Sequence, residues 1–154
     1  GPECDDPYFA QLVESCGALV VADRYCYGSL PGREEIVVAN GDTPLRAIAR
    51  HYLKTSQCAR FMPQDIMRER KQYLVDTAKE YGADGIIVAQ NKFCAYWSYE
   101  RTIDTIVIPR DYGIPVCSIE KEYINGASGQ LRTRFQAFVE ALELKIAERG
   151  EQNG

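Results

Sequence analysis

Residues 85–89 read Gly-Ile-Ile-Val-Ala, a short apolar run that ends at the polar residues Gln90 and Asn91. An uninterrupted run of this kind is typical of a parallel strand that helices cover on both faces. Residues 114–119 (Ile-Pro-Val-Cys-Ser-Ile) and 18–22 (Ala-Leu-Val-Val-Ala) have the same character. The sequence therefore predicts three buried parallel strands, and residues 35–39 could form a further short strand or an extended segment.

Helical patterns flank these runs, with apolar residues at three- and four-residue spacing. We expect helices over 7–16, 43–53, 64–81, 98–112 and 128–149, and we expect Pro109 to kink or interrupt the fourth. The residues expected to face inward are Phe9, Leu12, Val13, Leu45, Ile48, Ala49, Tyr52, Leu53, Ile66, Leu74, Thr77, Ala78, Tyr81, Leu131, Phe135, Phe138, Leu142 and Ile146.

This alternation of helix and strand predicts an α/β fold, a three-layer parallel sheet of flavodoxin-like or Rossmann-like type. The expected domain spans 1–150, and residues 151–154 are expected to fray. The chain starts with a loop and a helix where a first strand would be expected to have ended. This start hints at a C-terminal domain within a larger, multi-domain subunit.

Composition narrows the possible functions. The chain has 154 residues, 45% hydrophobic and 26% charged, which suits one globular domain. A net charge of −4 argues against a nucleic-acid binder, and no apolar run is long enough to span a membrane. The six cysteines include no closely spaced pair, which argues against a self-contained zinc or ferredoxin-type site. The simplest interpretation is a reducing cytoplasm in which cysteines serve as small apolar residues.

Ligands of open α/β sheets bind at the carboxyl ends of the strands. Segments 23–28, 90–97 and 120–123 lie there, and they contain Cys26 and Cys94. Cys94 could be a presented ligand or a thiol packed beside its aromatic neighbours, whereas Cys26 is better explained as structural. His51, the only histidine, lies in the middle of an expected helix, which argues against Cys–His catalysis.

Two basic segments have simple structural explanations. Residues 125–130 open the last helix and precede Arg132 and Arg134. A helix start with nearby arginines can hold an anion, but a turn, a cap and two solvated arginines explain it as well. Residues 68–71 (Arg-Glu-Arg-Lys) are most simply a solvated helix face.

Several segments occur together in an order that resembles one enzyme family. They are residues 16–23, 26–29, 82–88, 91–94 (Asn-Lys-Phe-Cys), 112–116 and 129–140 (Gly-Gln-Leu-Arg-Thr-Arg-Phe-Gln-Ala-Phe-Val-Glu). The chain resembles the C-terminal part of the 2-hydroxyacyl-CoA dehydratase / benzoyl-CoA reductase family, of the 2-hydroxyglutaryl-CoA dehydratase D-component type. The resemblance covers essentially the whole chain.

The resemblance implies an iron–sulfur protein. Subunits of this family hold a [4Fe–4S] cluster with cysteines from two domains, and the cysteine of the Lys-Phe-Cys loop maps onto Cys94. Cys58 is the plausible match for a further upstream ligand. The other ligands come from a region that this chain lacks, so the fragment alone is not expected to hold the cluster or to be active.

The resemblance also implies a substrate site. Tyr96 and Trp97, which stand where the family often has Asp-Pro, would form a wall of the interdomain cleft. Ser128, Arg132 and Arg134 are candidates for contact with CoA phosphate or a partner subunit.

The family's chemistry is an ATP-driven, low-potential radical reduction of an acyl-CoA thioester, followed by dehydration or by ring reduction. It implies three partners: a homologous second subunit, an ATP-hydrolysing iron–sulfur activator and the acyl-CoA itself. The alternative is a non-catalytic, flavodoxin-like binding or assembly module related to this family. A nucleotide- or flavin-binding domain is a weaker option, because no phosphate-cradling glycine loop follows any strand.

Overall fold

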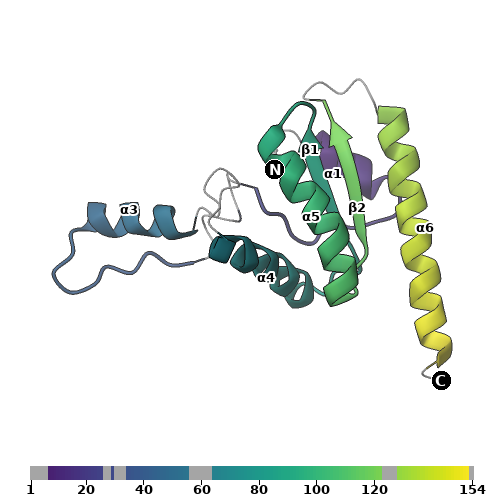
Figure 1. Cartoon of the computed structure of the whole chain (residues 1–154). Helices are drawn as coiled ribbons and strands as arrows, with labels where there is room; N and C mark the ends of the chain where they lie inside the picture. Colours follow the sequence, from purple (N-terminus) through teal and green to yellow (C-terminus); the bar gives the residue numbers. More distant parts are fainter. Residues whose placement is uncertain (1–6, 26–28, 30–33, 56–63, 123–127, 153–154) are drawn as a thin grey trace.

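The structure, a computed structural model, describes residues 7–25, 29, 34–55, 64–122 and 128–152 (Figure 1). The described part is α/β. Its elements are α1 (Tyr8–Glu14), α3 (Pro44–Thr55), α4 (Gln64–Glu80), β1 (Ile86–Asn91), α5 (Ala95–Tyr112), β2 (Val116–Lys121) and α6 (Ser128–Gln152).

The described sheet has two strands. β1 and β2 are parallel, with a register that runs from Ile86 opposite Val116 to Asn91 opposite Lys121. Two of the predicted strands are thus confirmed. Residues 18–22 form no strand, so the prediction of a third was wrong, and Leu19 is 75% exposed. An apolar run becomes a strand only where a neighbouring strand offers hydrogen-bonding partners, and the backbone of this run has none in the described sheet. Residues 35–39 are exposed and form no strand either.

Helices cover both faces of the sheet (Figure 1). On one face, Val75 of α4 and Ile108 of α5 pack with Ile86 and Val88 of β1. On the other, α1 and α6 pack with β2 around Leu12, Val13, Ile119 and Phe135. The predicted α/β class is therefore confirmed, but a sheet of two described strands does not confirm the predicted three-layer flavodoxin-like or Rossmann-like fold.

The helices around the sheet differ from expectation at their ends. α5 begins three residues early and continues through Pro109, so the expected interruption does not occur. Pro109 lies in the last turn, and its missing N–H removes one backbone hydrogen bond close to the point where the helix ends. Its end is set by Gly113, whose backbone has a φ of 70° and donates to Pro109 O at 3.1 Å. Tyr81 and Ile146, expected to be buried, are about half exposed. Tyr81 follows the end of α4, and Ile146 lies in the last turns of α6. The C-terminal end of α6 extends past the sheet (Figure 1).

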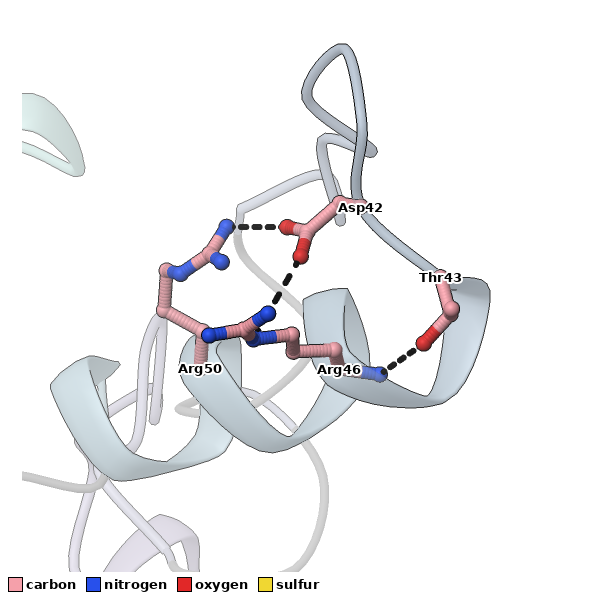
Figure 2. A network of polar contacts seen from close by, with 4 residues as sticks. All are labelled: Asp42, Thr43, Arg46 and Arg50. Carbon is pink, nitrogen blue, oxygen red and sulfur yellow. Dashed lines mark hydrogen bonds and ion pairs between the residues drawn. The ribbon is translucent and has the colours of Figure 1, made fainter.

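α3 lies away from the sheet (Figure 1). Its first turn is fixed by polar contacts: Thr43 Oγ1 accepts from the backbone N–H of Arg46 at 3.3 Å, and Asp42 pairs with both Arg46 and Arg50 (Figure 2). The predicted helix is confirmed, but burial of its apolar face was wrong. The exposed residues are Leu45, Ile48, Ala49, Tyr52 and Leu53, because the buried side of α3 is narrow and centred on Ala47.

His51 of α3 is half-buried and meets the ring of Tyr52 edge to face, with 5.4 Å between the ring centroids. None of the helices in the described ranges combines the length and the apolar character needed to cross a lipid bilayer.

Candidate functional site

The site lies where β1 and β2 end side by side. α5 follows β1, and α6 begins at the same end of the sheet as the tip of β2 (Figure 1). Lys92 joins the two strand ends twice. Its N–H donates to Lys121 O at 2.9 Å, and its Nζ pairs with Glu122 Oε1 at 2.6 Å. The hydrogen bond to Glu122 and the charge of that carboxylate raise the pKa of Lys92.

Cys94 stands directly before α5, at its N-cap position. Residues 91–94 form a tight turn, closed by the hydrogen bond from Cys94 N to Asn91 O at 3.1 Å; we call it the Cys94 turn. Phe93 lies within it in the left-handed region, with a φ of 64°, and its side chain is 99% exposed. The thiol of Cys94 is half-buried and free. The turn thus presents a cysteine at the edge where α/β proteins bind ligands.

The two predicted aromatic residues separate in the structure. Tyr96 is 56% exposed on the first turn of α5. Trp97 is half-buried, and the guanidinium carbon of Arg70 lies 5.4 Å from the centre of its ring, close enough for a cation–π contact. Trp97 therefore packs toward α4, while Tyr96 faces outward.

The remaining predicted site residues lie on α6 or outside the described residues. Ser128 is the first residue of α6, and its side chain is not among those described. Arg132 and Arg134 are exposed one to two turns further on. The charge of Arg134 reaches Cys117 in β2, where it partly offsets the burial that raises the pKa of that thiol. Cys58 and Cys26 lie outside the described residues.

A cluster of buried charged side chains joins α4 to α5, further along α5 than the Cys94 turn. It consists of Arg70 on α4, Glu100 and Asp104 on α5, and Arg24. Arg70 Nε donates to Glu100 Oε1 at 2.8 Å, and both side chains are almost completely buried. The prediction that residues 68–71 form a solvated face was therefore wrong at Arg70, which is 0% exposed.

Several buried atoms of this cluster have no hydrogen-bond partner in the described part of the chain. They are Arg70 Nη1 and Nη2, Glu100 Oε2 and Asp104 Oδ1. Burial, followed by the charge of Glu100, raises the pKa of Asp104 to about 6, against the opposing charges of Lys71, Arg24 and Arg70. Burial and then the charge of Arg70 lower the pKa of Arg24 to about 10.

These buried charges were missed, yet the helical spacing indicates them. Arg70 lies four residues before Leu74 and four after Ile66, both placed on the inward face. Glu100 and Asp104 continue a stripe that runs from Trp97 to the fully buried Ile108. The positions of these residues on the inward-facing stripes predict that they are buried, whereas their charge alone suggests that they are exposed to solvent.

Among the described residues, the edge offers one cysteine sulfur, which suits a single ligand of a metal cluster. The described cysteines are Cys16, Cys94 and Cys117. Cys16, which follows the end of α1, donates through Sγ to Leu12 O at 3.2 Å. Cys117 is the second residue of β2, near the opposite end of the strand, so Cys94 is the described cysteine at the edge. Over the described ranges, no group of three or more His, Cys, Asp or Glu residues is arranged to hold a metal ion. A cluster that used Cys94 would need its other ligands from outside those ranges.

Comparison with known proteins gives a family match and two named relatives. The family model described as "2-hydroxyglutaryl-CoA dehydratase, D-component" matches residues 1–142. "Putative dehydratase subunit YjiM" of Escherichia coli (strain K12) is 30% identical over 132 residues, which cover 86% of this chain and 33% of that protein. The "(R)-phenyllactyl-CoA dehydratase beta subunit" of Clostridium sporogenes is 30% identical over 141 residues, or 90% of this chain and 35% of that subunit. The chain thus spans about a third of the length of these relatives.

Proposed function

Because this chain belongs to the 2-hydroxyglutaryl-CoA dehydratase D-component family, we propose that it is part of a dehydratase subunit that acts on an acyl-CoA thioester. Both relatives are named as dehydratase subunits, one of them as putative, and the name of the other includes an acyl-CoA. These names favour dehydration over ring reduction. The observation that carries the proposal is Cys94, a free cysteine held in a turn at the carboxyl ends of two parallel strands.

We propose that Cys94 is one ligand of a [4Fe–4S] cluster whose other ligands lie outside the described residues, Cys58 among the candidates. Such a cluster, when bound, supplies low-potential one-electron chemistry at the thioester carbonyl. The chain's own contribution is to hold the sulfur at a fixed point of the edge. The short turn and the start of α5 do this, with the ion pair between Lys92 and Glu122 joining the strand ends.

The substrate would lie along the same edge. We propose that Tyr96, which is exposed beside the Cys94 turn, contacts the acyl group, and that Trp97, which packs toward α4, forms part of the same wall. The start of α6, with Ser128, Arg132 and Arg134, offers positive charge for the phosphates of CoA or for a partner subunit.

The partners proposed are a homologous second subunit and an ATP-hydrolysing iron–sulfur activator. The beta subunit named among the relatives supports a multi-subunit assembly. The free described thiols suit a reducing cytoplasm.

The decisive experiment measures iron. The subunit in which this sequence occurs is purified without oxygen as wild type and as Cys94→Ser, and iron and acid-labile sulfide are measured per subunit. We expect Cys94→Ser to lose most of its iron. Cys117→Ser is the matched control and should keep its iron, because Cys117 is the second residue of β2, far along the strand from the edge that carries Cys94. Normal iron content in Cys94→Ser would refute the ligand assignment, whereas a wild-type subunit without iron would favour a non-catalytic module.

A further inference from the structure

The Cys94 turn is strained. Phe93 has a φ of 64°, a conformation that costs a residue with a side chain about 1 kcal/mol or more. Its ring is 99% exposed, so burial of the ring does not compensate for that cost. A strained residue persists where neighbouring contacts over-determine the backbone. The contacts that hold this turn therefore help to determine the geometry of the site.

Gln90 supplies the contact that reaches the turn from the sheet. It lies on the same face of β1 as Ile86 and Val88, the face that packs against α4 and α5, and it is 3% exposed. Its Nε2 donates to Cys94 O at 3.1 Å. Its Oε1 is buried and has no hydrogen-bond partner in the described part of the chain. An apolar side chain would avoid the cost of that oxygen, so the amide is retained at an energetic disadvantage.

The carbonyl of Cys94 accepts two hydrogen bonds. One comes from Gln90 Nε2 and the other from the backbone N–H of Ser98 at 3.0 Å, in the first turn of α5. Gln90 thus connects the sheet, the turn and the helix through one oxygen atom. Without the amide donor, β1 would no longer constrain the direction of that carbonyl, and the strain at Phe93 would favour release of the turn.

We propose that Gln90 is a positioning residue that fixes the Cys94 sulfur by holding the backbone carbonyl of the same residue. The meaning of this role for a metal cluster rests on the proposed function. The positioning itself is a property of this chain and is tested on the chain alone, without iron.

The test uses two variants that remove the donor in different ways. Gln90→Met keeps the unbranched shape without polar atoms, and Gln90→Glu keeps the shape but turns the donor into an acceptor. Gln136→Met, on the exposed face of α6, is the matched control. Amide hydrogen exchange is followed by NMR at Cys94 and Ser98, with the N–H of Gly113 at the far end of α5 as reference. Iodoacetamide labelling of Cys94 is followed on the tryptic peptide 93–101, with Cys117 as reference.

We expect exchange at Cys94 and Ser98, and alkylation of Cys94, to rise about fivefold in both variants, the factor that corresponds to one hydrogen bond of about 1 kcal/mol. Gly113, Cys117 and the Gln136→Met variant should not change. Unchanged exchange at Cys94 and Ser98 in both variants would overturn the proposal. So would an equal rise at Gly113, which means general loosening, or faster exchange with unchanged alkylation, which means that the thiol is not positioned. A positive result together with normal iron in Cys94→Ser would sustain this inference and refute only the proposed role of Cys94 as a cluster ligand.

Discussion

Replacement of Arg70 by methionine tests whether the buried charge cluster holds α4 and α5 together. Arg70 and Glu100 are both almost completely buried and joined by one hydrogen bond of 2.8 Å. Removing one partner of a buried pair leaves the other charge uncompensated, at a cost of about 3–5 kcal/mol. Arg70 Nη1 and Nη2 are themselves buried without partners, and their removal recovers part of that cost. We therefore expect a loss of about 3 kcal/mol in the free energy of unfolding.

Urea unfolding followed by tryptophan fluorescence measures this loss. Trp97 is the only tryptophan in the chain, and its ring lies against Arg70, so the signal reports on this contact. With a urea dependence of about 2 kcal/mol per M, the midpoint should fall by about 1.5 M at pH 8. At pH 5 the loss should be smaller, because Asp104, with a pKa of about 6, is then mostly protonated and one buried negative charge is gone.

Two comparisons make the test sharp. Arg68→Met, at an exposed position of the same helix, should change stability by less than about 0.5 kcal/mol. The double variant Arg70→Met/Glu100→Leu should lose less than Arg70→Met alone, because no unpaired charge of the pair remains. The reasoning is refuted if Arg70→Met matches Arg68→Met, or if the two substitutions in the double variant simply add.

Two further predictions concern the same helices and the sheet. The pKa of Asp104 is raised from 3.8 to about 6, so the folded state favours the protonated carboxyl. The contribution of Asp104 to the free energy of unfolding is therefore complete below pH 4 and is lost as the pH rises through 6. Asp104→Asn should be more stable than wild type at pH 8 by up to about 3 kcal/mol. Urea midpoints from pH 4 to 8 check this, and equal pH profiles for both proteins would contradict it. Gly85→Ala would bring a Cβ within 2.7 Å of Phe138 and 3.2 Å of Leu142, and should cost about 1–3 kcal/mol in thermal unfolding. Gly129→Ala, with open space around it, is the control, and a similar melting temperature for both variants would exclude overpacking.

The parts of the fold that the sequence predicts well are those in which local pattern and tertiary packing agree. β1, β2, α4, α5 and α6 were all expected close to their observed positions, since each has an apolar face that meets the sheet or packs beside it. Residues 18–22 are as apolar as β1, but a strand also needs a neighbour for its backbone hydrogen bonds, and composition does not reveal that neighbour. α3 shows the same limit for helices, because its pattern predicts helix formation correctly and burial incorrectly.

The position of the candidate site follows from the best-predicted part of the chain. Two parallel strands must end at the same edge, and this requirement places Cys94 beside the tip of β2 without knowledge of any side chain. The residue that holds Cys94 could also have been found. Side chains alternate between the faces of a strand, so Gln90 must lie on the face of Ile86 and Val88, where the burial of β1 indeed alternates. A glutamine on that apolar face, one position before the strand ends, has its carboxamide buried under the following turn and must find a partner there. Its partner is the carbonyl of Cys94, and for that reason the amide is better explained by the turn it holds than by the core it interrupts.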